Sequence, residues 1–301
     1  MIKTLVLAGG TGFVGQIFES HATAHGYRCL ILTRRPVREN EIYWDGSTID
    51  EWAGYLEDAV AVINFAGHSV DCIHNERNRN AILQSRIDSV NAIAQAIQQC
   101  EAPPQVWIQS SAVGIFGNTS EICDENAPLG DDFMAEVCKA WEVSCLDNDT
   151  NIRKCCFRFG IVLGANGGAL KPLRTLSRLL LGGTAGSGNQ WMSWIHEEDV
   201  CRIILETIEN ESMSGAYNVT GPTPMKNRDF MAQVRRALNR PWSPPAPSFA
   251  VTIGARFLLN TDPTLALHGQ RVIPKRLTDM DFEFKYPELA DALTDIFSRW
   301  R

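Results

Sequence analysis

Residues 4–15 read TLVLAGGTGFVG, an apolar run that passes directly into a glycine-rich turn. Gly9, Gly12 and Gly15 form the pattern G-x-x-G-x-x-G between a strand predicted over 2–8 and a helix predicted over 13–24. Gly9 permits a tight turn, Gly12 lets main-chain amides approach a pyrophosphate, and Gly15 lets the helix pack closely on the strand. The pattern predicts a dinucleotide site, and a purely structural strand-to-helix turn is the alternative. The residues predicted to face the cofactor here are Gly9, Thr11, Gly12, Phe13 and Val14.

Strand-like and helix-like segments alternate along the first half of the chain. The predicted strands are 2–8, 27–32, 59–65, 106–110 and 154–159, and the predicted helices are 13–24, 77–99 and 132–146. This alternation predicts an α/β fold of the Rossmann type, a doubly wound parallel sheet with helices on both faces. We expect a nucleotide-binding domain over 1–165. Later segments, up to about residue 225, can complete its sheet. A smaller, partly helical C-terminal lobe is expected over 166–301, with helices at 250–260 and 287–298.

Composition limits the classes of partner. The chain of 301 residues has a net charge of -7 and no run of Lys or Arg, so we expect no nucleic-acid binding. No apolar stretch approaches the roughly 18 residues that a membrane span needs, and we expect a cytoplasmic protein with no membrane partner. Nine cysteines, none in a Cys-x-x-Cys pair, predict buried reduced thiols rather than a disulfide framework or a metal site.

The end of the second predicted strand indicates which dinucleotide is bound. Thr33-Arg34-Arg35 stands where an acidic side chain would accept hydrogen bonds from the adenosine ribose and favour NAD. A guanidinium there can instead hold a 2′-phosphate through paired, charge-assisted bonds. The sequence therefore predicts NADP in contact with Thr33, Arg34 and Arg35. The alternative is two arginines on a solvated loop.

The tetrapeptide Asn64-Phe65-Ala66-Gly67 closes the third predicted strand. Ligands of open α/β sheets bind at this carboxyl edge, and small residues there let the strand end lie close to adenosine and ribose. Phe65, Ala66 and Gly67 are therefore candidate cofactor contacts, with simple turn chemistry as the alternative.

Taken together and in order, the motifs resemble the extended short-chain dehydrogenase/reductases and, within them, an "epimerase family protein" group with a short conserved C-terminal domain. The further segments that carry the resemblance are Ser85-Arg86, Ser111–Gly117, Lys139–Glu142, Arg158–Gly164, Gly186–Gly188, Trp194–Asp199 and Arg271–Pro274. The resemblance implies an NADP-binding Rossmann fold, a C-terminal family domain over 249–298 and a small-molecule substrate such as a nucleotide sugar, and it leaves a homo-oligomer open. It implies that the residues near the cofactor include Thr33, Arg34, Phe65, Ala66, Arg86 and Val162.

Arg86 also has a physical argument of its own, because an arginine on the helix after the Ala-Gly turn can reach a phosphate. A solvent-exposed helical arginine is the alternative.

Two of the three catalytic residues of that superfamily, the Tyr and the Ser or Thr, are absent. Its enzymes need a Tyr separated from a Lys by three residues, so that the ammonium lowers the phenol pKa, together with a Ser or Thr that polarises the substrate. Here Lys139 is preceded at that spacing by Ala135, and Ala112 stands at the Ser/Thr position. Ser111 and Lys139 are the candidate catalytic residues. The other residues weighed for proton transfer are Glu136, Cys138, His196 and Asp199, for which a solvated charge, a buried thiol, a packed ring and a helix cap are the alternatives.

The glycine-rich tract 182–188, with Gln190, Trp191 and Trp194, is a candidate wall of the substrate site, and a lobe-packing loop is the equal alternative. Two functions remain open. One is an NADP-dependent oxidoreductase or epimerase with a non-standard proton donor, and the other is a catalytically inactive NADP(H)-binding sensor or regulatory protein.

Overall fold

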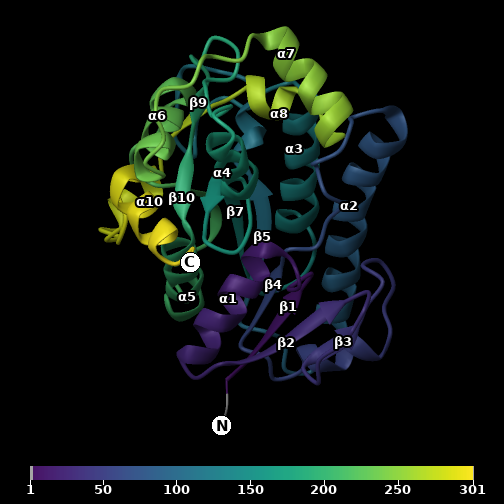
Figure 1. The fold of residues 1–301 in the computed structure, drawn as a ribbon. Coiled ribbons are helices and arrows are strands. Elements are labelled where there is room, and N and C mark those ends of the chain that lie inside the picture. Colours follow the sequence, from purple (N-terminus) through teal and green to yellow (C-terminus); the bar gives the residue numbers. More distant parts are fainter. Residues whose placement is uncertain (1–2, 301) are drawn as a thin grey trace.

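The computed structural model describes residues 3–300 and contains one large parallel sheet of seven strands (Figure 1). In spatial order the strands are β3 (Glu41–Tyr43), β2 (Arg28–Thr33), β1 (Thr4–Ala8), β4 (Ala61–Asn64), β5 (Val106–Ala112), β7 (Arg153–Phe159) and β11 (Gly215–Val219). The chain runs outward in one direction from β1 to β3 and in the other from β4 to β11, which makes the β1/β4 boundary the topological switch point. The predicted doubly wound parallel α/β fold is confirmed.

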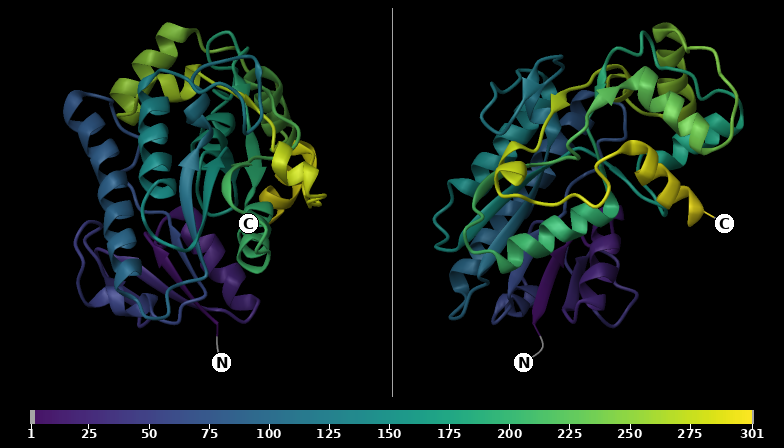
Figure 2. Two further views of the ribbon diagram at one scale, coloured as in Figure 1. Left: turned by 180° about the vertical axis from the view of Figure 1, so that it is seen from behind. Right: turned by 90° about the vertical axis from the view of Figure 1, so that its left-hand side faces the viewer.

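Helices cover both faces of the sheet, as Figures 1 and 2 show. α1 (Phe13–Ala24) and α5 (Glu197–Glu209) pack together on one face, and α2 (Glu76–Gln99), α3 (Phe133–Leu146) and the short helix η1 (Glu51–Leu56) cover the other. Alternation along β1 explains this: Leu5 and Leu7 enter the first core, whereas Val6 and Ala8 enter the second.

Two strands of the large sheet are not among those predicted from the sequence: β3, and β11, which lies in the segment up to about residue 225 that was expected to complete the sheet. Glu41–Tyr43 forms the edge strand β3, so the strand that ends at Asn64 is the fourth along the chain and not the third. Three residues at a partly exposed edge are too few to show an alternating pattern. Phe65 lies outside β4 because Asn64 starts a turn.

The second lobe has its own core, which includes Trp194, Phe230 and Leu293. In Figure 1 the yellow-green helices near residue 250 lie above β5 and β7, and the yellow C-terminal helix lies to the left of these strands. The remaining elements are η2 (Val113–Phe116), β6 (Ile122–Cys123), β8 (Ile161–Leu163), α4 (Leu170–Arg178), β9 (Trp191–Met192), β10 (Trp194–His196), β12 (Met225–Lys226), α6 (Asn227–Ala237), α7 (Ser248–Ile253), the π-helix η3 (Gly254–Leu259), α8 (Thr264–Leu267), β13 (Arg271–Val272), α9 (Lys275–Asp279) and α10 (Leu289–Ser298). Within residues 3–300, no helix is both long and apolar enough to cross a membrane.

Candidate functional site

The three glycines of the first turn meet different surroundings. Gly9 has a φ of +70°, and a Cβ there would lie 2.8 Å from the Cα of Ala66. A Cβ on Gly15 would lie 2.4 Å from the Gly10 carbonyl oxygen, so the start of α1 packs on the turn itself. A Cβ on Gly12 would meet only the Gly9 carbonyl oxygen, at 3.5 Å. Packing of the protein explains Gly9 and Gly15, whereas Gly12 leaves room beside the main chain for a ligand.

The N-terminus of α1 is open. Gly12 is its N-cap and supplies no capping side chain, and within residues 3–300 no acceptor receives the main-chain N–H groups of Phe13 and Val14. The Phe13 ring is enclosed by Gly164, Gly167 and Gly168, where added Cβ atoms would approach it within 2.9, 2.6 and 2.7 Å. The Phe13 ring therefore packs on this glycine segment, while its amide stays free for a ligand. Free amides at a helix N-terminus favour an anion such as a pyrophosphate.

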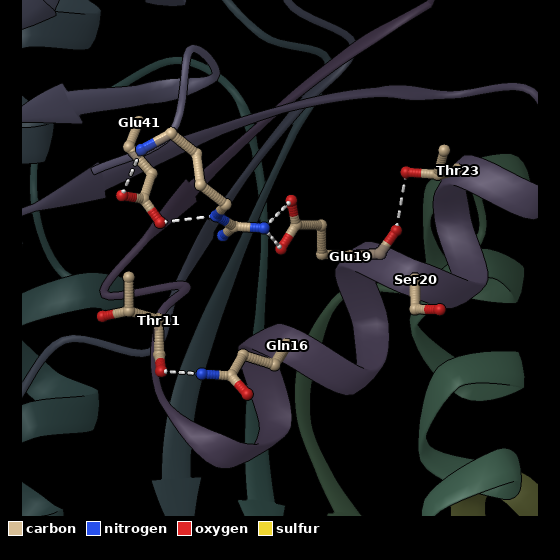
Figure 3. Close-up of a pocket in the computed structure, with 7 residues that line it drawn as sticks. Thr11, Gln16, Glu19, Ser20, Thr23 and Glu41 are labelled. Atoms are coloured by element: carbon tan, nitrogen blue, oxygen red, sulfur yellow. Dashed lines mark hydrogen bonds and ion pairs between the residues drawn. The ribbon is translucent and has the colours of Figure 1, made fainter. Parts of the chain in front are cut away.

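The loop after β2 holds arginines in two different states. Arg38 is bound by two carboxylates, with its Nε 2.7 Å from Glu41 and its Nη1 2.9 Å from Glu19. These contacts line a hollow of about 500 Å³ along α1, where the Gln16 side chain also donates to the Thr11 carbonyl oxygen (Figure 3). Arg34 and Arg35 are exposed and make no ion pair within the described residues. Arg34 and Arg35 directly follow the end of β2. The Gly9 amide donates to the Leu32 carbonyl oxygen near that end, so the two arginines lie beside the glycine turn.

The turn after β4 is fixed from within. The Asn64 Oδ1 accepts a 2.9 Å hydrogen bond from the Ala66 amide, while its Nδ2 donates to Ser89 and Gln109. The fully buried Asn64 thus holds Phe65, Ala66 and Gly67 against the glycine turn, which Ala66 touches through Gly9. The glycine turn and the turn over residues 64–67, which are separate motifs in the sequence, therefore form one surface.

Arg86 is buried on α2 and has no carboxylate partner within the described residues. Its Nη1 donates to the carbonyl oxygens of His68 at 3.0 Å and Ile82 at 2.8 Å, and its guanidinium lies 4.6 Å from the Trp141 ring centroid. Burial lowers the pKa of Arg86. A Cβ on Gly67 would lie 3.3 Å from its Cζ, so the guanidinium faces the Ala-Gly turn. The alternative of a solvent-exposed helical arginine is wrong, and a buried cation without a counter-charge is a position suited to an anionic ligand.

Val162 lies on β8 and pairs with Ile195 of β10. A Cβ on Gly168 would lie 2.9 Å from the Val162 carbonyl oxygen and 2.7 Å from the Phe13 ring, so this segment joins the start of α1. The structure therefore brings Val162 to the same carboxyl edge of the sheet as the glycine turn.

Ser111 is tied into a buried ion pair that sequence reasoning did not assign. Its hydroxyl donates to Glu142 Oε1 at 2.6 Å, and Arg158 donates to the same carboxylate through Nε and Nη2, both at 2.9 Å. Burial lowers the pKa of Arg158, but the hydrogen bonds and charge of Glu142 outweigh it and the net shift is upward. Glu142 and Arg158 both stand in motifs that carry the family resemblance, which is the only signal the sequence offers for them.

The other candidates lie on α3, the helix that also carries Glu142. The Lys139 ammonium forms an ion pair with the Glu136 carboxylate one helical turn earlier, so each charge already has a partner. Burial raises the pKa of Cys138 to about 12, which keeps its thiol protonated at neutral pH. The methyl group of Ala135, at the usual tyrosine position, is fully buried.

His196 and Asp199 have structural partners. His196 and not Asp199 is the N-cap of α5, with its Nδ1 accepting from the Glu198 amide at 3.1 Å, so the expected helix cap at Asp199 is wrong. The expected packed ring is confirmed, since His196 is buried with its ring centroid 3.9 Å from that of Tyr286. Asp199 receives the main-chain amides of Lys285 and Tyr286. Trp194 is fully buried in the lobe core, which favours lobe packing over a substrate wall for this residue. Trp191 remains partly exposed.

This geometry is shared with known proteins. Residues 5–220 match the family described as "NAD dependent epimerase/dehydratase family", and residues 246–296 match a domain of unknown function, DUF1731. The chain is 35% identical over 304 residues to the "Epimerase family protein SDR39U1 homolog, chloroplastic" of Arabidopsis thaliana, covering 97% of this chain and 86% of that protein. It is similar to the crystal structure of the human epimerase family protein SDR39U1 with NADPH, with a TM-score of 0.88, 30% identity and coverage of 98% and 99% of the two chains. It is also similar to the nucleoside-diphosphate sugar epimerase from Corynebacterium glutamicum, with a TM-score of 0.79 and 27% identity, covering 97% of this chain and 57% of that chain.

Proposed function

Since this chain belongs to the NAD dependent epimerase/dehydratase family, we propose that it binds NADP(H) in its Rossmann cleft and acts as an epimerase-like or oxidoreductase-like protein on a small molecule, without the usual catalytic tyrosine. The human relative described with NADPH supports the cofactor, and the nucleoside-diphosphate sugar epimerase supports a nucleotide sugar as the substrate class.

The observation that carries this proposal is the buried guanidinium of Arg86, which lies beside Gly67 and has no carboxylate partner among residues 3–300. The protein bears the cost of burying this charge, and a cofactor phosphate would supply the missing counter-charge. The free amides of Phe13 and Val14 and the clearance at Gly12 fit a pyrophosphate nearby. Arg34 and Arg35, which have no acidic partner within residues 3–300, would hold the 2′-phosphate. These residues fit the cofactor.

A bound nicotinamide would supply a hydride donor or acceptor. The chain's own residues then have three tasks. Thr33, Phe65, Ala66 and Val162 would position the cofactor, Lys139 would hold the nicotinamide ribose after releasing Glu136, and Ser111 would orient a substrate oxygen. Glu142 accepts a hydrogen bond from the Ser111 hydroxyl, so this hydroxyl must turn away from Glu142 to donate to a substrate.

The first experiment is a titration of the cofactor-stripped protein with NADPH and with NADH, followed by nicotinamide fluorescence. Selective binding of NADPH is the expected result. If neither nucleotide binds, the glycine turn is only architecture and the proposal fails.

The enzyme part has its own test in a panel of nucleotide sugars, with NADPH consumption and epimer interconversion as readouts. Lys139→Met should abolish any turnover found while leaving the unfolding transition unchanged, because this lysine is partly exposed. Unchanged turnover would remove Lys139 from the mechanism.

A second function is favoured by one specific observation. Ala135 and Ala112 replace two catalytic groups, and the remaining hydroxyl of Ser111 is already bonded to Glu142. A catalytically inactive NADP(H)-binding regulatory protein would need none of these groups. Tight NADPH binding without turnover of any substrate in the panel would support this second function.

A further inference from the structure

The side chains of Lys226 and Arg271 lie over the Trp191 ring, and among the described residues no carboxylate pairs with either. Trp191 pairs across β9 and β12 with Lys226, whose Nζ lies 5.8 Å from its ring centroid. The Arg271 guanidinium lies 4.4 Å from the same centroid. Within residues 3–300 neither cation forms an ion pair, and the buried Nε of Arg271 has no hydrogen-bond partner. This pairing of an indole with two unused positive charges is a feature that the proposed cofactor site does not involve.

The cluster is held firmly in place. The Gln190 side chain donates to the Ala266 carbonyl oxygen at 2.8 Å, and a Cβ on Gly269 would lie 2.1 Å from the Trp191 carbonyl oxygen. The Ser193 hydroxyl accepts from the Val272 amide at 2.9 Å. The segments that carry Trp191 and Arg271 are therefore fastened to each other on both sides of the pair. Side chains on such a fixed support need little reordering to bind a ligand.

The cluster also lies on the substrate side of the sheet. Gly269 accepts from the Thr119 amide at 3.0 Å and donates to Asn118 Oδ1 at 3.0 Å, and Arg271 pairs with Ile122. This loop leaves the carboxyl end of β5 shortly after Ser111. Figure 1 shows β9 above β5 and β7, on the side to which those strands point. Ligands of doubly wound sheets bind at this edge.

Nearby acidic residues do not cancel these charges. Glu121 precedes Ile122, the strand partner of Arg271, but it is exposed and forms no ion pair with Arg271. Asp229 pairs with Arg228, at 3.7 Å. An arginine stacked on an indole keeps the N–H groups along its edge free, and that edge matches a carboxylate or phosphate.

We propose that Trp191, Lys226 and Arg271 form an anion subsite that receives the phosphate or carboxylate group of the substrate. This inference rests on the proposed function, because it names the chemical class of the molecule that the substrate side accepts. Arg271 supplies the directed contact, Lys226 adds charge, and Trp191 fixes both cations.

The test is calorimetric titration of the NADPH-saturated protein with UDP, with glucuronate and with uridine. UDP probes a phosphate, glucuronate probes a carboxylate, and uridine is the uncharged control. Arg271→Gln should weaken binding of the anionic probe by roughly tenfold or more, since a charge-assisted hydrogen bond is lost. Arg271→Lys should restore part of the affinity. The matched control is Arg174→Gln, because Arg174 also stacks on a tryptophan, 4.5 Å from the Trp300 ring centroid, but in α4 of the lobe.

Binding of UDP but not glucuronate to the wild type assigns the subsite to phosphate, and the reverse assigns it to carboxylate. The inference is overturned if neither anion binds the wild type, or if Arg271→Gln and Arg174→Gln have the same effect. NADPH affinity is measured in parallel and should stay within about twofold in all variants, since no cofactor contact is changed. Failure of NADPH binding in the wild type would remove the proposed function instead. The anion titrations, run without NADPH, would then still decide the subsite.

Discussion

The hydroxyl of Ser111 donates a 2.6 Å hydrogen bond to the carboxylate of Glu142. The same carboxylate neutralises Arg158, and all three residues are buried. The candidate catalytic hydroxyl is therefore part of a charged cluster that also joins β5, α3 and β7.

Glu142→Gln should lower the free energy of unfolding by about 3–5 kcal/mol, because it leaves the Arg158 charge buried without its partner. Urea denaturation measures this loss. Ser111→Ala is the matched control and should cost only about 1 kcal/mol, since it removes one neutral donor. Equal small losses in the two variants would contradict a structural role for the ion pair.

Arg34→Asp should reduce NADPH affinity selectively, because the new carboxylate would repel the 2′-phosphate that NADH lacks. We expect the ratio of the two dissociation constants to change by roughly tenfold or more. Arg38→Ala is the control, since Glu19 and Glu41 already bind that guanidinium and the ratio should not change. An equal loss for NADPH and NADH in Arg34→Asp would exclude the 2′-phosphate role.

Arg86→Met should weaken NADPH binding by roughly tenfold or more and NADH binding to a similar degree, because the pyrophosphate that we propose it contacts is common to both cofactors. The same change should not lower the free energy of unfolding of the cofactor-free protein by much, since a buried unpaired charge is removed. Arg79→Met on the same helix is the control, because Arg79 stacks on Phe133 and donates to the His74 carbonyl oxygen. Fluorescence titration checks the affinities, and unchanged binding in Arg86→Met would count against a cofactor contact.

The free energy of unfolding should fall as the pH drops below 6.5, in part through His196. Burial lowers the pKa of this ring below its usual 6.5; Asp295 and Asp199 oppose that shift, and Arg299 adds to it. The unfolded chain therefore binds a proton at a higher pH than the folded chain, and stability is lost between 6.5 and the lower folded value. His21, whose pKa burial also lowers, contributes in the same window.

Urea denaturation at several pH values between 7.5 and 5 would measure this slope, in the wild type and in His196→Asn. The asparagine retains an N-capping oxygen but has no proton to gain. It should flatten the slope without removing it, because His21 remains. An identical slope in the two proteins would show that His196 does not titrate differently on folding.

The glycine turn and the alternation of strands and helices could be predicted from the sequence, because both depend on residues that are close together along the chain. The spacing of Gly9, Gly12 and Gly15 reports the turn, and side chains that alternate along β1 report a sheet covered on both faces. Arg34 and Arg35 needed no tertiary information either, since their position follows from the end of a strand. The short edge strand β3 was missed because three residues carry no period.

The partners of individual side chains were decided only by the tertiary structure. Ser111 and Glu142 are 31 residues apart in sequence, and Arg86 is buried because α2 and α3 pack against each other and place Trp141 over it. The sequence shows that Asp199 lies at the start of a helix. Only the tertiary structure shows that its carboxylate accepts hydrogen bonds from the Lys285 and Tyr286 amides and that His196 is the N-cap. A hydrogen bond or ion pair forms where packing brings two groups within about 3 Å of each other, and this distance cannot be predicted from their separation in the sequence. The sequence alone therefore determined the fold and the candidate cofactor-binding residues, while the structure determined which of the polar side chains already have partners within the described residues.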